Sequence, residues 1–118
     1  MFTDNVNIQI TGEGPVAVIS FTTPSLSDVD SITRASTRIK DYIQQEQPTT
    51  VIFDFDKVKF FSSQVLGLML ETRAVLQNTN GRVMVSSVCP RLYRVFEITN
   101  LNQVFNFFPD RQTAIKAC

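Results

Sequence analysis

Phe60-Phe61-Ser62-Ser63-Gln64-Val65-Leu66-Gly67 places two hydroxyl side chains between an apolar strand and an apolar helix. Residues 51–55 just before it are almost wholly apolar, which predicts a buried strand, and residues 68–77 just after it are predicted to be helical. The first N–H groups of a helix have no intrahelical partner, and the helix dipole favours negative charge there. A phosphate on serine would suit this position, so the run predicts a phosphorylation switch rather than a catalytic centre.

The segments on either side of this run alternate between strand and helix patterns. Apolar and polar residues alternate near the N-terminus, and a following Gly-Pro turn makes this segment the first arm of an antiparallel hairpin. Further along, apolar residues recur at helical spacing between short apolar runs that are typical of buried strands. The expected order is strand 6–11, strand 16–21, helix 28–45, strand 49–55, helix 63–78, strand 83–86, a helix opened by Pro90, a short strand 104–107 and a helix from Pro109.

This order predicts one α/β domain over residues 1–118, with a mixed sheet of four or five strands, an N-terminal hairpin and about four helices. Strands that alternate with helices pair in parallel through right-handed crossovers. We expect the helices to back one face of the sheet. In the second helix, the residues expected to share the inward face are Leu66, Met69, Leu70, Arg73 and Ala74.

The composition disfavours several classes of protein. Lys plus Arg and Asp plus Glu both number 11 and no basic cluster is present, so we expect no nucleic-acid surface. No apolar run approaches the roughly 18 residues of a membrane span, and the N-terminus does not resemble a signal peptide. The chain has only two cysteines, Cys89 and Cys118. We therefore expect a reduced, cytoplasmic protein without membrane insertion.

Missing residue types also argue against catalysis and metal binding. The chain has no histidine, so it can form neither a Ser-His or Cys-His nucleophile pair nor a histidine metal site. Asp54 and Asp56 form a carboxylate pair, for which acid–base or metal chemistry is the weaker interpretation. The simpler one is that Asp54 accepts hydrogen bonds from loop amides and that Asp56 shapes a turn. We expect a protein that is not an enzyme and that holds no metal or cofactor.

The residues next to the two serines have both structural and functional interpretations. Phe60 and Phe61 either both belong to the core, or the outward one anchors a partner; Phe61 is the candidate anchor, with Lys59 beside it. Gly67 interrupts the helix at a cost of about 1 kcal/mol relative to alanine. A close approach of the helix to a strand is the expected reason for this glycine.

The order of elements and the central run together resemble the STAS domain family, whose name refers to sulfate transporters and anti-sigma factor antagonists. The family's motif is a strand ending in Asp, a short loop, an aromatic or aliphatic pair, and then Asp-Ser-Ser/Thr-Gly-Leu-Gly. In this chain the corresponding pieces are residues 52–55, 56–59, 60–61 and 62–67. Residues 86–105 also match the family's tail, with Asn100 at a position where glycine is usual, and residues 109–117 resemble its final helix.

The resemblance implies a partner-switching role in bacterial transcription regulation. In anti-sigma factor antagonists of this family, the serine after the motif Asp is phosphorylated, and by position this serine is Ser63. The unmodified protein then binds an anti-sigma factor serine kinase and frees a sigma factor. Phosphorylation ends that binding, and a PPM-type phosphatase restores it. The residues expected to contact the partner are Lys59, Phe61, Ser62, Ser63 and Gln64.

Three positions depart from the family's motif. Ser62 replaces the motif Asp, Gln64 replaces the second hydroxyl, and Val65 replaces the usual glycine. Serine remains a strong helix N-cap, but the carboxylate beside the acceptor is lost, and Ser62 becomes an alternative phosphorylation site. The loss of the motif Asp also fits an alternative function, a non-phosphorylated STAS scaffold or ligand-binding module in a signalling or lipid-transport complex.

Overall fold

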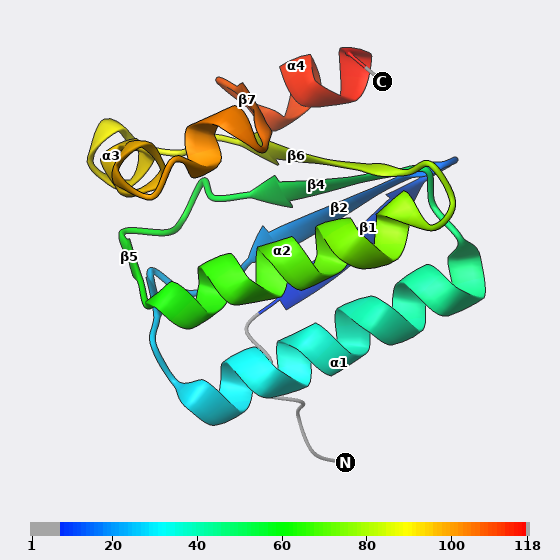
Figure 1. Cartoon of the computed structure of the whole chain (residues 1–118), viewed down its shortest axis with the longest axis horizontal. Helices are drawn as coiled ribbons and strands as arrows, with labels where there is room; N and C mark the ends of the chain where they lie inside the picture. Colours follow the sequence, from blue (N-terminus) through cyan, green and yellow to red (C-terminus); the bar gives the residue numbers. More distant parts are fainter. Residues whose placement is uncertain (1–7, 118) are drawn as a thin grey trace.

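The computed structural model describes residues 8–117, in which a five-stranded sheet lies among four α-helices (Figure 1). Of the predicted first strand, residues 6 and 7 lie outside the described residues, as does Cys118. In chain order the elements are β1 (Ile8–Glu13), β2 (Val16–Phe21), β3 (Ser25–Leu26), α1 (Val29–Glu46), β4 (Thr50–Asp54), β5 (Phe60–Phe61), α2 (Ser63–Gln77), β6 (Arg82–Ser86), α3 (Pro90–Ile98), a short 3-10 helix (Leu101–Gln103), β7 (Asn106–Phe108) and α4 (Arg111–Lys116).

The strands of the main sheet follow the order β1-β2-β4-β6-β7. β1 and β2 form an antiparallel hairpin, and the other three neighbouring pairs are parallel. Each parallel pair is connected through a helix, which confirms the predicted α/β fold with a mixed sheet. The last strand is shorter and later than predicted because Asn100 takes a left-handed backbone (φ 63°) and the chain first makes a 3-10 turn. Within residues 8–117, no helix has the length and apolarity needed to cross a membrane.

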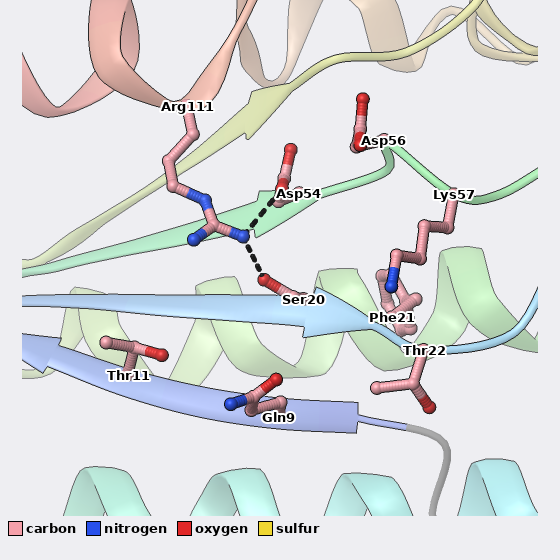
Figure 2. A pocket seen from close by; sticks show the side chains of 9 residues that line it. All are labelled: Gln9, Thr11, Ser20, Phe21, Thr22, Asp54, Asp56, Lys57 and Arg111. Carbon is pink, nitrogen blue, oxygen red and sulfur yellow. Dashed lines mark hydrogen bonds and ion pairs between the residues drawn. The ribbon is translucent and has the colours of Figure 1, made fainter.

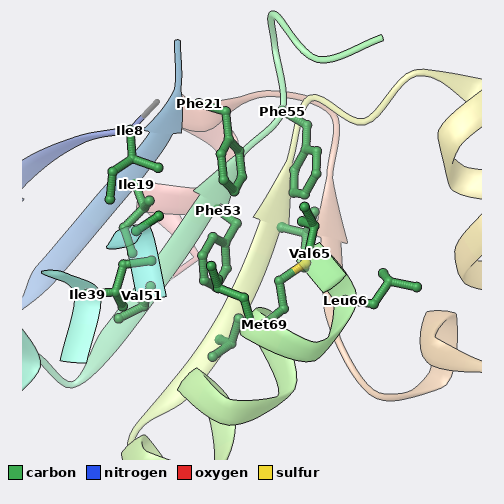
Figure 3. Close-up of a cluster of buried hydrophobic side chains, with 14 of the residues drawn as sticks. Ile8, Ile19, Phe21, Ile39, Val51, Phe53, Phe55, Val65, Leu66 and Met69 are labelled. Atoms are coloured by element: carbon green, nitrogen blue, oxygen red, sulfur yellow. The ribbon is translucent and has the colours of Figure 1, made fainter. Parts of the chain in front are cut away.

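The larger core lies between the sheet and helices α1 and α2 (Figure 3). β4 contributes Val51 and Phe53, β2 contributes Ile19, and the helices contribute Ile39 and Met69, all of them at most 1% exposed. Burial of one such side chain stabilises the fold by about 1.5–3 kcal/mol. This packing holds α2, and with it the two serines at its start, in a fixed place against the sheet.

A smaller core lies on the second face of the sheet, where α4 packs. Ala114 of α4 is fully buried there with Val18, Ile52 and Met84 of the three central strands. The expectation that helices back only one face is therefore wrong. Every residue of β4 is buried, so apolar side chains project from both of its faces and both need a cover.

The inward face of α2 differs from the predicted one. Leu70 is 39% exposed and Ala74 is exposed, whereas Thr72 is buried. The Thr72 hydroxyl donates a hydrogen bond to the Leu68 carbonyl at 2.8 Å, which allows this polar side chain to lie in the core. Because Thr72 is polar, the apolar pattern alone did not identify the buried face of this helix. The buried residues of α2 are Val65, Leu66, Leu68, Met69, Thr72 and Leu76.

Candidate functional site

A small second sheet holds the segment that leads into α2. Strands β3 and β5 pair in parallel, with Ser25 beside Phe60 and Leu26 beside Phe61. The N–H of Ser62 then donates to the carbonyl of Leu26 at 2.9 Å. Backbone bonds therefore fix the approach to the helix, and Figure 1 shows that α1 and α2 begin at the same end of the molecule.

The two serines differ in their access to solvent. Ser62 is the N-cap of α2, with extended backbone (φ −85°, ψ 165°), but its side chain makes no cap hydrogen bond. Its Oγ is buried and has no hydrogen-bond partner among the described residues. Ser63, the first residue of the helix, is exposed. Of these two residues, Ser63 is therefore the one whose side chain is open to solvent.

The two positions after Ser63 explain how the departures from the motif are tolerated. Gln64 is exposed, as expected of a residue that contacts a partner. Val65 is 1% exposed and belongs to the larger core. The valine side chain therefore contributes apolar packing under the first turn of the helix without changing the surface beside Ser63.

The structure reverses the expected orientation of the two phenylalanines. Phe61 is 7% exposed, and its ring centroid lies 5.7 Å from those of both Phe55 and Phe96. Such aromatic pairs add about 0.5–1.5 kcal/mol each to the stability from burial. The assignment of Phe61 as a partner contact is therefore corrected: Phe60, which is 52% exposed, is the outward ring, and Lys59 is exposed next to it. The alternation of side chains along an extended segment indicated that one ring points outward, but it did not indicate which of the two.

The start of α2 carries no negative charge of its own, because no acidic residue lies in its first turn. The start of α1, at the same end of the molecule, is capped by Asp28. The Ser31 hydroxyl (2.6 Å) and the Ser31 N–H (3.1 Å) donate to the Asp28 carboxylate and lower its pKa. At α4, the Thr113 N–H lowers the pKa of the capping Asp110 in the same way. The starts of α2 and α3 have no carboxylate cap of this kind, since their N-cap residues are Ser62 and Cys89.

Asp54 and Asp56 have different surroundings, since Asp54 is buried and Asp56 is exposed. Asp54 is 4% exposed, and its Oδ1 and Oδ2 accept from the Ser86 hydroxyl and the Arg111 guanidinium, each at 2.9 Å. The expected bonds from loop amides are therefore replaced by side-chain bonds, and no local signal links Asp54 with Arg111, 57 positions away. Asp56 lies exposed in a turn closed by a 3.0 Å bond from the Val58 N–H to the Phe55 carbonyl. Within residues 8–117, no group of three or more His, Cys, Asp or Glu is placed to hold a metal ion.

The explanation expected for Gly67 is wrong. A Cβ added at this position would meet no atom within 4 Å, so the helix does not approach a strand there. Gly67 instead lines an open groove of about 350 Å³ between α1 and α2. Lys40 of α1 and Glu71 of α2 form a 3.3 Å ion pair in the same groove. No contact in the described chain requires glycine at position 67.

Comparison with known proteins identifies relatives over almost the whole chain. The family model described as STAS domain matches residues 7–114. An anti-sigma-factor antagonist (STAS) domain protein from Planctomyces limnophilus is 26% identical, with a TM-score of 0.82, over 93% of this chain and 95% of that one. The anti-sigma factor antagonist SpoIIAA in its unphosphorylated form is 20% identical, with a TM-score of 0.74, over 93% of this chain and 94% of that one.

The same fold also matches SpoIIAA after modification. The Bacillus cell fate determinant SpoIIAA in its phosphorylated form is 21% identical, with a TM-score of 0.72, over 94% of this chain and 99% of that one. At this identity the likeness shows a shared fold. The fold of these antagonists is therefore the fold of residues 8–117.

Proposed function

This chain belongs to the STAS domain family, and from that premise we propose that it is an anti-sigma factor antagonist controlled by reversible phosphorylation of Ser63. The observation that carries this proposal is the exposed Ser63 hydroxyl at the first turn of α2. In the unmodified state the protein binds an anti-sigma factor serine kinase in the bacterial cytoplasm, and a sigma factor is released. Phosphorylation ends the binding, and a PPM-type phosphatase reverses it.

The proposed switch acts through charge at an otherwise unchanged surface. A phosphate adds about −1.5 to −2 charges at pH 7. It is well tolerated at Ser63, because helix N-termini favour anions and the first turn of α2 holds no acidic residue. A partner docked over this turn would have to remove water from the phosphate, which costs free energy, or would repel it through negative charges of its own. The fold is therefore retained while the complex is lost.

Phosphoryl transfer to Ser63 needs a base from the kinase. The kinase moves the γ-phosphoryl group of ATP to the Ser63 Oγ, ADP leaves, and the hydroxyl proton passes to a base. The family has Asp at the position of Ser62, and the Oγ of Ser62 is neither a carboxylate nor exposed. We infer that the kinase itself supplies the group that accepts this proton.

The proposed docking surface has an aromatic anchor beside the modified residue. Phe60 is 52% exposed, although burial is the usual environment of phenylalanine. Lys59, Ser63 and Gln64 surround it in the chain and are exposed. At interface hot spots, an aromatic side chain usually becomes buried in the complex and is surrounded by a rim of polar residues. Phe60 takes the role first assigned to Phe61.

Binding measurements with an anti-sigma factor kinase from the same genome test this proposal. Ser63→Asp is expected to weaken the complex at least about tenfold, which corresponds to about 1.4 kcal/mol. Ser63→Ala keeps the binding and loses the phosphorylation, and Ser62→Ala keeps both. Unchanged binding of Ser63→Asp, together with no phosphate on residue 63, would reject the switch.

A second candidate function is a constitutive STAS module in a signalling or lipid-transport complex. The loss of the motif Asp at Ser62 favours it, because that carboxylate accompanies the acceptor serine in the family. This function predicts partner binding that neither Ser63→Asp nor kinase treatment changes. The same binding series therefore separates the two candidates.

A further inference from the structure

The second face of the sheet is only partly covered by α4 and becomes polar where the cover ends. β2 and β4 present apolar side chains to α4 and then Ser20 and Asp54 near their carboxyl ends. β1 extends this polar area, because Gln9 is paired in register with Ser20, and Thr11 lies two residues further along the same strand. The polar side chains of these three adjacent strands therefore form one continuous polar surface, called the floor below: Gln9, Thr11, Ser20 and Asp54.

A cavity of about 140 Å³ lies over this floor (Figure 2). Arg111 at the start of α4 and Lys57 in the loop after β4 reach over the strands from two sides, and Asp56 stands at the rim. A water molecule needs about 10–15 Å³ of such space, so the cavity has room for several waters or one small ligand. It is too small for a nucleotide or a drug-sized molecule, whose sites measure about 300–1,000 Å³.

Buried groups hold one wall of the cavity in place. The Arg111 Nη2 donates to the Asp54 carboxylate at 2.9 Å and also to the Ser20 hydroxyl. Asp54 is 4% exposed and is held on its other oxygen by Ser86. A guanidinium has five N–H donors, and these two bonds use only one of its nitrogens. The other N–H groups of Arg111 are therefore held in place by the two bonds and can still donate to a ligand.

The remaining polar groups of the cavity have no partner in the described chain. Between residues 8 and 117, the lining side chains without a hydrogen bond or ion pair are those of Gln9, Thr11, Thr22, Asp56 and Lys57. They supply an ammonium, a carboxylate, an amide and two hydroxyls around a single small volume. These groups offer one ligand both hydrogen-bond donors and acceptors, and both a positive and a negative charge.

We propose that this cavity binds a small α-amino acid in its zwitterionic form, such as glycine or serine. The carboxylate of the ligand binds Lys57 and the free N–H groups of Arg111, and its ammonium group binds the carboxylate of Asp56 at the rim. Charge-assisted hydrogen bonds of this kind are about twice as strong as neutral ones.

The charge balance of the lining favours a zwitterion over a simple ion. Two cationic side chains, Lys57 and Arg111, face two carboxylates, Asp54 and Asp56, so the lining has no net charge. A lone anion would place a second negative charge near the buried Asp54. A lone cation would meet Arg111 and Lys57. A ligand with both charges offsets these costs, because its ammonium group binds Asp56 while its carboxylate binds Lys57 and Arg111, and with few heavy atoms it fits the volume.

Titration of the full chain by two-dimensional NMR tests the assignment, with glycine, L-serine, acetate and methylammonium as probes. Glycine or serine is expected to give saturable shifts at the amides of residues 9, 20, 57 and 111. Acetate and methylammonium, which each carry half of the ligand, are expected to bind at least about tenfold more weakly. Lys57→Ala is expected to weaken glycine binding about tenfold, and Lys116→Ala, on α4 but outside the lining, is the control with unchanged affinity.

Two variants and two outcomes make the test decisive. Asp56→Asn, which preserves shape, is expected to weaken glycine binding and leave acetate binding unchanged. Lys57 and Asp56 are both exposed, so circular dichroism of the variants should match that of the parent chain. Equal affinities for acetate and glycine would indicate an anion site and overturn the proposal. Absence of saturation by glycine and serine up to about 50 mM would also overturn it.

Discussion

Ser62 and Ser63 are neighbours in the chain, yet the Oγ of Ser62 is buried with no hydrogen-bond partner in residues 8–117, and the side chain of Ser63 is exposed. The extended backbone of Ser62, whose N–H is bonded to Leu26, turns into the helix at Ser63 and separates the two side chains. The start of α2 therefore presents one accessible hydroxyl from a pair that looks equivalent in the sequence.

Replacement of Ser62 with alanine is expected to change the free energy of unfolding by less than about 0.5 kcal/mol. Loss of a serine N-cap usually costs about 1 kcal/mol, because a side-chain hydrogen bond to the helix is removed. Ser62 makes no such bond, so alanine removes only an unpartnered buried hydroxyl. Urea denaturation measures the change. In the control Asp28→Ala, a carboxylate that does accept from Ser31 is lost and the midpoint falls. An equal fall for Ser62→Ala would show that the hydroxyl caps the helix in solution.

Phe60→Ala and Phe61→Ala are expected to separate binding from stability. Phe61 lies in the core, so its truncation should lower the free energy of unfolding by about 3–5 kcal/mol. Phe60 is half exposed, so its truncation should cost less than about 1 kcal/mol and should weaken the kinase complex by more than about 1 kcal/mol. Thermal unfolding and calorimetric titration of both variants give the two numbers. Full kinase affinity in Phe60→Ala would remove the aromatic anchor from the proposed interface.

The ion pair between Asp54 and Arg111 is expected to stabilise the attachment of α4. Each single alanine variant should lower the free energy of unfolding by about 1–3 kcal/mol, because a buried polar partner is left unpaired. Water reaches Arg111, whose side chain is 42% exposed, so the cost stays below that of a fully buried pair. A double-mutant cycle should give a coupling energy of at least about 0.5 kcal/mol. Strict additivity of the two changes would mean that the pair contributes nothing to stability.

Gly67→Ala is expected to stabilise the protein by about 0.5–1 kcal/mol, because alanine has the higher helix propensity and the position opens onto free space. The melting temperature of the variant should therefore rise. A fall in melting temperature would mean that the groove between α1 and α2 is narrower in solution than in the structure. Gly81→Ala is the contrasting variant, since its added Cβ would lie 3.0–3.1 Å from Leu76 and Thr49.

Local patterns predicted the features that depend on neighbouring residues. The apolar run at 51–55 predicted a buried strand, and β4 (Thr50–Asp54) is fully buried there. Pro90 opened α3, and Asn100 adopted the left-handed backbone expected of glycine. α2 also begins at Ser63, as the pattern predicted. These features follow from side-chain periodicity and backbone preference, which the sequence displays directly.

Features that depend on distant residues were not predictable from local pattern. Arg111 reaches Asp54 across 57 positions, and α4 covers the second face of the sheet, although its six residues carry little apolar signal. The choice between Phe60 and Phe61 depended on the position of Phe96, which the sequence does not reveal. The segment that leads into α2 is likewise held by the pairing of β3 with β5, which joins parts of the chain that are distant in sequence. Tertiary contacts decided each of these cases.

Phosphate mapping by mass spectrometry after treatment with an anti-sigma factor kinase tests the central claim most directly, with Ser62→Ala and Ser63→Ala as paired controls. We predict phosphate on Ser63 alone in the parent chain and in Ser62→Ala, and none in Ser63→Ala. Phosphate on Ser62, or an unmodified Ser63 under conditions in which the kinase binds the protein, would contradict the account.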